Sequence, residues 1–212
     1  MSSLSSDDGL LRGFANPVMD AQGVFRTVLA AMACPGTMNE LALDLSGPAP
    51  LDPATAALAL ALLDYETPLW LDSAADTPSV QRYLRFHCGC RMTENAGAAA
   101  FAIVAAPALM PPLAAFDAGS DTYPDRSTTV ILQVPSLTGG APWTLQGPGI
   151  HPGGIRERAC MAISGLPAGF GRWIEANVAL FPCGVDLIFT CGRAFAALPR
   201  SIRVEDAACM SQ

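Results

Sequence analysis

Lysine is absent from this chain of 212 residues, and all of its basic residues are arginines. Without a lysine amine the chain cannot form a Schiff base with pyridoxal phosphate, and it cannot supply the lysine of a P-loop. We therefore expect no pyridoxal phosphate and no other cofactor. Charge of either sign is also scarce, since charged residues make up 15% of the chain and hydrophobic ones 51%. A surface this poor in charge predicts that a partner covers part of it.

A basic face and a disulfide framework are also missing. The net charge of −7 argues against nucleic acid as a partner, because nucleic-acid binding needs a basic surface. The seven cysteines are an odd number, and the first residues, "MSSLSSDDGLLRGF", contain no basic region followed by a long apolar stretch. We therefore expect a cytoplasmic protein with reduced thiols, most of them small buried hydrophobes.

One uncharged segment is long enough to span a bilayer, which takes ~20 apolar residues. It covers residues 96–116, "AGAAAFAIVAAPALMPPLAAF". Pro111 and Pro112 would break a spanning helix. A strand over Ala100–Val104, a turn and a short helix fit this composition better, so no membrane span is expected.

Apolar spacing and breakers predict four helices. The segment 18–33 repeats apolar side chains every three or four residues on one face, and Cys34-Pro35-Gly36 ends it. A second helix begins at Asp52-Pro53 and is apolar nearly all round, so it should be sandwiched between other elements. A third helix begins at Thr77-Pro78, and a fourth covers roughly residues 169–180. The side chains on the first helical face are Phe25, Val28, Leu29 and Met32.

Strands alternate with these helices. Thr128–Val134 gives the strongest strand pattern, and Gly139-Gly140 turns the chain toward a second strand, "WTLQG". The segments "GVDLIFT" and "AFAAL" flank residues 191–193 and predict a β-hairpin near the end of the chain. Shorter strands are predicted at 38–45 and 67–71. This order indicates an α/β layered domain with a mixed sheet. We assign one domain to residues 16–206, a disordered or loosely docked segment to 1–15 and a tail to 207–212.

The segment "RYLRFHCGC" places a histidine, two thiols and two arginines within nine residues, at the expected end of the third helix. Zinc ligation would need a second pair of ligands, and the only other histidine is His151. A thiol activated by His87 is conceivable, but the negative end of a helix disfavours a thiolate. The favoured interpretation is that cationic side chains cap the last helical carbonyls while Cys88 and Cys90 pack inside. An arginine cluster facing an anion or an acidic partner remains the alternative. The cationic residues are Arg82, Arg85 and His87.

Three further features have both a structural and a functional interpretation. Residues 147–154, "GPGIHPGG", match no nucleotide-binding spacing and favour a long turn. Polar residues 123–127, "YPDRS", stand at the entry of the strongest strand, where either a ligand pocket or an interface is common. Asp186 lies among apolar residues and needs a partner, for which Arg200 or Arg193 is the natural candidate. No complete catalytic set, metal set or phosphate loop is apparent.

Six segments in order along the chain resemble the PhnH family, a core subunit of the bacterial carbon–phosphorus lyase machinery. The resemblance runs from about Asn16 to Glu205. Each motif alone is weak, but six in the same order are specific. They are "QGVFRTVLAAMACPG", "LLDYETPLWL", "LRFHCGC", "YPDRSTTVILQVPSLTGG", "LQGPGI" and "NVALFPCGVDLIFTCGRAFAALPRSIRVE".

The resemblance implies a cytosolic protein needed for growth on alkylphosphonates. It implies a complex with the core subunits PhnG, PhnI and PhnJ, which helps to form a ribose 1-alkylphosphonate 5-triphosphate from MgATP and a phosphonate with release of adenine. PhnJ later cleaves the carbon–phosphorus bond. The implied fold is a three-layer α/β/α arrangement like the large domain of pyridoxal-phosphate transferases, without the cofactor. Family members form homodimers when isolated and pair with PhnJ in the complex.

The resemblance gives no catalytic assignment and no metal ligand. We therefore expect a non-catalytic structural and assembly subunit. The alternative is a subunit that binds a phosphonate or nucleotide phosphate at a dimer or subunit interface. The polar positions that match the family motifs, or stand beside them, are predicted to be interface or ligand-pocket residues. They are Gln22, Arg26, Arg85, His87, Tyr123, Arg126, Asp186 and Arg200.

Overall fold

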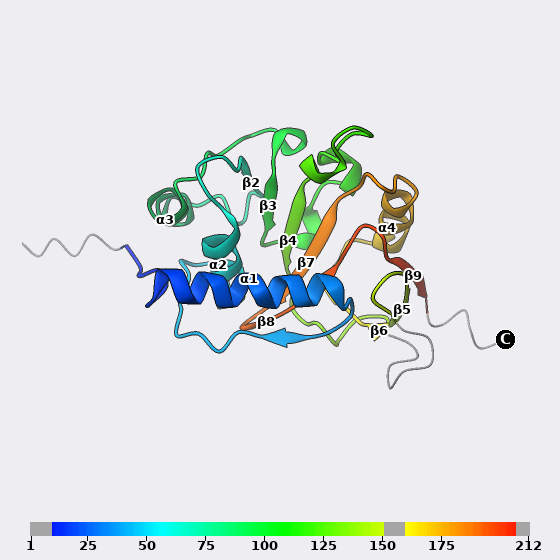
Figure 1. The fold of residues 1–212 in the computed structure, drawn as a ribbon, viewed down its shortest axis with the longest axis horizontal. Coiled ribbons are helices and arrows are strands. Elements are labelled where there is room, and N and C mark those ends of the chain that lie inside the picture. Colours follow the sequence, from blue (N-terminus) through cyan, green and yellow to red (C-terminus); the bar gives the residue numbers. More distant parts are fainter. Residues whose placement is uncertain (1–9, 151–159, 207–212) are drawn as a thin grey trace, which may run out of the picture.

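The computed structural model describes residues 10–150 and 160–206. The predicted tail and residues 151–154 of the glycine-rich segment 147–154, including His151, lie outside these residues, as do residues 1–9 of the predicted N-terminal segment. The described chain forms a six-stranded sheet with helices and a smaller three-stranded sheet around it (Figure 1).

The first helix, α1 (Pro17–Ala33), is held at its start by Asn16, whose side chain accepts a hydrogen bond from the Met19 amide. A proline at the first helical position suits this start because its missing N–H would have no partner there. The predicted helix is confirmed, but part of its predicted face points outward. Val24, Val28 and Ala31 are the buried residues. Phe25 and Leu29 are instead 45% and 53% exposed.

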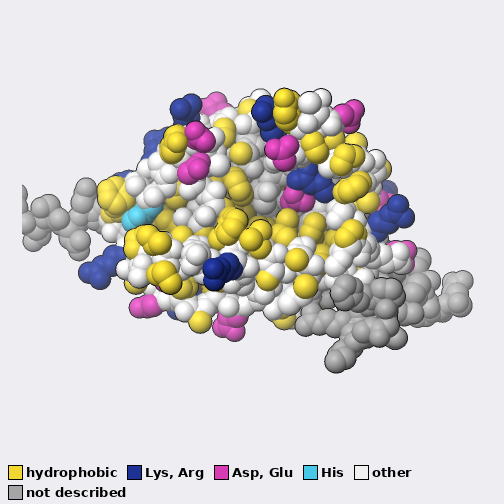
Figure 2. Space-filling view, in the orientation of Figure 1, with side chains coloured by type: hydrophobic (Ala, Val, Ile, Leu, Met, Phe, Trp, Pro, Cys, Tyr) yellow, Lys and Arg dark blue, Asp and Glu magenta, His cyan; other side chains and the backbone are white. Residues whose placement is uncertain are grey.

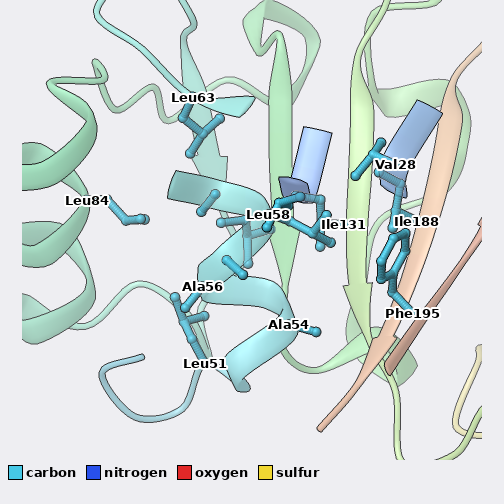
Figure 3. Close-up of a cluster of buried hydrophobic side chains, with 14 of the residues drawn as sticks. Val28, Leu51, Ala54, Ala56, Leu58, Leu63, Leu84, Ile131, Ile188 and Phe195 are labelled. Atoms are coloured by element: carbon cyan, nitrogen blue, oxygen red, sulfur yellow. The ribbon is translucent and has the colours of Figure 1, made fainter. Parts of the chain in front are cut away.

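Helix α2 (Pro53–Leu62) is buried on all sides along its first turns, as its composition predicted. Residues 54–59 are all buried. Figure 1 shows α2 behind α1 and beside α3 (Pro78–Cys88). Small alanine side chains let α2 approach its neighbours closely, while Leu58 fills the space toward the sheet (Figure 3).

The main sheet has the strand order β1-β8-β7-β4-β3-β2. The four strands from β7 to β2 are parallel, whereas β8 runs antiparallel to β7, and β1 antiparallel to β8. The predicted mixed sheet and C-terminal hairpin are therefore confirmed. The predicted strand 38–45 is much shorter, since only two of its residues pair. The strand bounds are β1 (Asn39–Glu40), β2 (Leu69–Leu71), β3 (Phe101–Val104), β4 (Thr129–Gln133), β7 (Asp186–Cys191) and β8 (Ala194–Leu198).

The strand predicted after Gly139-Gly140 forms, but it belongs to a separate sheet. This strand, β5 (Trp143–Gln146), pairs antiparallel with β6 (Cys160–Met161) and with β9 (Arg203–Asp206). The fourth helix, α4 (Phe170–Val178), packs near it.

Two hydrophobic clusters lie on the two faces of the main sheet, because successive strand residues point to opposite sides. Ile131 and Ile188 belong to the cluster with α1, α2 and α3 (Figure 3). Val130 and Phe189 belong to the cluster with α4 and the small sheet. Burying both faces explains why the strands are apolar without interruption.

The uncharged segment 96–116 contains β3 and three single-turn 3-10 helices. Among the described residues, no helix combines the length and the apolar character that crossing a membrane requires. The 3-10 turns are η1 (Ala96–Ala98), η2 (Pro107–Leu109) and η3 (Leu113–Ala115), and a fourth, η4 (Pro124–Arg126), precedes β4.

Candidate functional site

The predicted polar residues fall into three separate groups. Gln22 and Arg26 lie on the exposed side of α1. Arg85 and His87 lie on the last turn of α3. The third group meets at the amino-terminal ends of β4 and β7, where η4 contacts the turn after β8. This third group consists of Tyr123, Arg126, Asp186 and Arg200.

Asp186 and Arg200 form the predicted ion pair. The Arg200 guanidinium contacts the carboxylate through Nη2, and Nε lies 3.1 and 3.2 Å from the two carboxylate oxygens. The Arg200 backbone amide also donates to Oδ1 of Asp186, at 2.8 Å. Arg200 Nη1 reaches the Pro124 carbonyl oxygen at 2.6 Å. Only 16% and 14% of the two side chains are exposed, so the pair joins three chain segments rather than presenting a charge to a ligand.

Arg126 keeps its guanidinium exposed beside this pair. It lies over the Tyr123 ring, 4.1 Å from the ring centroid, in a cation–π contact. The next residue, Ser127, was not predicted as a site residue. Its hydroxyl is the single buried side-chain polar atom without a hydrogen-bond partner within residues 10–150 and 160–206. Because buried hydroxyls normally have partners, this unpartnered one marks an unusual position in the described chain. An isolated serine beside a strand gives no such signal in sequence.

His87 does not cap its own helix, which corrects the prediction. Helix α3 ends at Gly89, which has a φ of 67° and donates its amide to the Arg85 carbonyl oxygen. The His87 ring instead lies 3.0 Å, through Nε2, from the Leu11 carbonyl oxygen and packs against the Tyr83 ring. The Tyr83 hydroxyl donates to the Arg12 carbonyl oxygen at 3.3 Å. His87 therefore holds the segment before α1 on the end of α3.

Replacing His87 with alanine is expected to loosen residues 11–14. The change removes a hydrogen bond, which is worth about 1 kcal/mol, so amide exchange in this segment should accelerate about fivefold. Hydrogen exchange followed by mass spectrometry measures this effect. Arg82→Ala is the matched control, because Arg82 is on the same helix. Equal exchange in wild type and His87→Ala would contradict this role.

Of the two thiols in the segment "RYLRFHCGC", Cys90 is buried, as favoured from the sequence, and Cys88 is half-buried against the hydrophobic cluster. Burial raises the pKa of the Cys88 thiol to about 12, with a smaller contribution from Cys90. Burial also raises the pKa of Cys90, which is 3% exposed. A neutral thiol is a poor nucleophile and a poor metal ligand. Within the described part of the chain, no three His, Cys, Asp or Glu side chains are grouped as a metal site.

A cavity of about 620 Å³ lies at the carboxyl ends of β3, β4 and β7, where ligands often bind to α/β sheets. None of the predicted site residues lines it. Its polar side chains already have partners. Gln133 accepts from the Asp52 amide at 2.7 Å and donates to the Pro50 carbonyl oxygen at 2.8 Å, and Asp52 accepts from the Gly192 amide at 2.8 Å. This network holds the start of α2 on the sheet and was not predicted.

Comparisons with known proteins agree with the ordered motifs. The family described as "Bacterial phosphonate metabolism protein (PhnH)" matches residues 12–205. The chain is 39% identical over 192 residues to the alpha-D-ribose 1-methylphosphonate 5-triphosphate synthase subunit PhnH of Rhizobium meliloti (strain 1021), covering 91% of this chain and 94% of that protein. It is also 33% identical over 86 residues to the putative C-P lyase subunit protein HtxG of Stutzerimonas stutzeri, covering 41% of this chain and 42% of that protein.

Proposed function

This chain belongs to the PhnH family, and from that premise we propose that it is a non-catalytic structural and assembly subunit of a carbon–phosphorus lyase core complex. Such a complex serves alkylphosphonate catabolism by forming a ribose 1-alkylphosphonate 5-triphosphate from MgATP and a phosphonate. The proposal places the protein in the cytoplasm, with PhnG, PhnI and PhnJ as partners and a homodimer as its isolated form.

The names of the two relatives support a subunit role, since one is a synthase subunit and the other a putative C-P lyase subunit. The observation that carries the proposal is that several candidate polar groups bond to other segments of the same chain. Asp186 and Arg200 hold three segments together, His87 holds the chain before α1, and Cys88 is neutral and packed. These four side chains, which look chemical in sequence, thus have structural tasks.

A fold with the three-layer α/β/α arrangement of pyridoxal-phosphate transferase domains is part of the proposal. Its support is the pair of hydrophobic clusters, one on each face of the main sheet. A fold of this kind offers two helical outer surfaces for contacts with other subunits.

Reconstitution of the core complex with and without this chain tests the assembly role. We expect the remaining subunits to co-purify poorly, and to turn over MgATP and methylphosphonate slowly, when the chain is omitted. Adding back the purified chain should restore both. Full assembly and full turnover without it would refute the proposal.

A second candidate function is binding of a phosphonate or nucleotide phosphate near η4. The observation that favours it is the unpartnered Ser127 hydroxyl directly after Arg126, whose exposed guanidinium can hold an oxyanion with two N–H groups. Arg85 and His87, grouped with these residues from the sequence alone, have no contact with them in the described chain.

Calorimetric titration of the purified protein with ATP, and separately with methylphosphonate, tests this candidate. Binding heat should appear in wild type and be lost in Arg126→Ala. Arg172→Ala is the control, because Arg172 is also an arginine but lies on α4. Absence of heat at millimolar ligand would remove the candidate.

A further inference from the structure

The cavity at the carboxyl ends of β3, β4 and β7 carries a negative charge and no positive one. Its volume of about 620 Å³ lies within the ~300–1,000 Å³ of typical ligand pockets. Of the described residues that line it, only Asp52 is charged. Charged side chains are few on this molecule, and Figure 2 shows them scattered among hydrophobic ones on the face that carries α1. A carboxylate kept in a cavity therefore needs an explanation.

Asp52 precedes helix α2, but its side chain does not cap that helix. It turns instead to the loop between β7 and β8, where Oδ2 accepts from the Gly192 amide at 2.8 Å. The backbone amide of Asp52 donates to Gln133 Oε1 at 2.7 Å, so both the main chain and the side chain of the residue are fixed. Oδ1 has no hydrogen-bond partner among residues 10–150 and 160–206. A carboxylate accepts up to about four hydrogen bonds, so this group has room for a donor.

The Asp52 carboxylate has no counter-ion in the described part of the chain. The one ion pair found there joins Arg200 to Asp186. Arg193, which follows the loop glycine, donates to the Leu43 carbonyl oxygen instead. The partial positive charge at the amino end of α2 favours a charged Asp52, but it does not supply a hydrogen-bonded cation. The missing counter-ion indicates which kind of ligand the cavity accepts.

A second carboxylate lies behind the cavity wall and adds to its negative potential. Asp72 is 6% exposed, and its Oδ2 accepts from the amide of the lining residue Ala106 at 2.8 Å. Its Oδ1 accepts from the Ala75 amide, also at 2.8 Å. Asp72 takes part in no ion pair among the described residues either. Because buried charges are weakly screened, both carboxylates favour a cation in the cavity and oppose an anion.

The remaining walls of the cavity are small and mostly apolar. Residues 105–108 form one wall, and Val134 and Pro135 contribute to another. Walls of this kind suit an aliphatic stem, since long cationic side chains pack their methylene groups on apolar surface and keep the charged head in a polar place. The described lining contains no arginine, the residue that best holds phosphate or phosphonate oxygens. The cavity thus fits a cation on an aliphatic chain.

We propose that this cavity binds an alkylammonium or alkylguanidinium group, with the charged head on Asp52 and the stem along residues 105–108. The head donates to the unoccupied Oδ1 and supplies the missing counter-ion. The chain has no lysine, so an ammonium group of this kind comes from another molecule. Its source is either a small free amine or a lysine or arginine side chain of a partner protein. The site is a property of the isolated chain and does not depend on the assembly role.

NMR titration of the isotope-labelled full chain tests the site, with butylammonium as the cationic probe. The Gly192 and Ala106 amide resonances should shift and saturate at millimolar probe, because both amides donate to the carboxylates at the cavity. Butyrate, an anion with the same aliphatic chain, should leave these resonances unchanged. Absence of a saturable shift with butylammonium, or equal shifts with butyrate, would overturn the proposal.

Asp52→Asn is the decisive variant, because asparagine keeps an acceptor oxygen for the Gly192 amide and removes the charge. It should raise the dissociation constant for butylammonium about tenfold or more. Glu175→Gln is the matched control, since it removes one charge from an exposed position on α4 and should leave the constant unchanged. Ala108→Phe narrows the cavity at an exposed lining position, leaves Asp52 in place and should also weaken binding, so it decides the test if Asp52→Asn fails to fold. Wild-type affinity in folded Asp52→Asn would overturn the proposal.

The reconstituted core complex distinguishes the two sources of the cation. If a side chain of a partner fills the cavity, butylammonium should no longer bind this chain within the complex. If a small amine is the ligand, butylammonium should bind the complex and the isolated chain alike. Either result supports the cation site and identifies the source, with the complex that contains Asp52→Asn as the blank. Failure of the complex to form would count against the assembly role, whereas failure of the isolated chain to bind butylammonium would count against this site.

Discussion

Replacing Arg200 with alanine is expected to lower the free energy of unfolding by about 3 kcal/mol. The change removes the main partner of the Asp186 carboxylate, whose side chain is only 14% exposed, and leaves that charge with the Arg200 amide as its remaining donor. It also removes the hydrogen bond to the Pro124 carbonyl oxygen, which holds η4 on the end of the sheet. Urea denaturation followed by circular dichroism measures the loss.

Arg193→Ala is the control for this prediction. Arg193 is exposed and donates to the Leu43 carbonyl oxygen, so its removal should cost less than about 1 kcal/mol. The double variant Asp186→Leu, Arg200→Leu distinguishes the cost of a buried, unpaired carboxylate from the cost of losing side-chain packing. It should be more stable than Arg200→Ala, because no charge is left buried without a partner. Similar stability of wild type and Arg200→Ala would show that the ion pair is not structural.

Elements whose structure is decided by a local pattern were predictable from the sequence. Thr129–Gln133, within the predicted range Thr128–Val134, forms a central strand because β-branched residues suit a strand buried on both faces. Asn16, Asp52 and Thr77 all precede a proline that begins a helix. The inward side of α1 was harder to predict. Two apolar stripes compete on that helix, and only tertiary packing shows that Val24 and Val28 point inward while Phe25 and Leu29 do not.

The residues of the candidate site also fall into those that a local pattern predicts and those whose contacts depend on tertiary packing. The Asp186–Arg200 pair was predictable, because an acid within an apolar strand must find a cation. The contact between His87 and Leu11 was not, since the two residues are 76 positions apart and a helix end offers nearer carbonyls. The Gln133 network at the start of α2 was unpredictable for the same reason, because its hydrogen bonds to Asp52 and Thr55 span 81 and 78 positions. Contacts at such distances depend on how the elements pack.

Alkylation of Cys88 in the folded protein is expected to be about 1000-fold slower at pH 8 than that of an accessible thiol with an ordinary pKa. Burial raises the pKa of this thiol from about 9 to about 12, which lowers the thiolate fraction by that factor. Peptide mass spectrometry after timed iodoacetamide treatment measures the rate, with the exposed Cys34 as the accessible reference. In urea both cysteines should react at similar rates. Rapid alkylation of folded Cys88 would restore the nucleophile interpretation.

The same raised pKa predicts how stability depends on pH. Between pH 9 and 12 the unfolded chain loses the Cys88 proton while the folded chain retains it, so the free energy of unfolding is unaffected below this interval and falls within it. The slope is about 1.4 kcal/mol per pH unit for one such group. Cys88→Ala should therefore lose less stability than wild type between pH 9 and 11. Tyr83, whose pKa burial raises from 10 to about 12, keeps a residual slope in both proteins. Identical pH profiles would show that Cys88 reaches solvent in the folded chain.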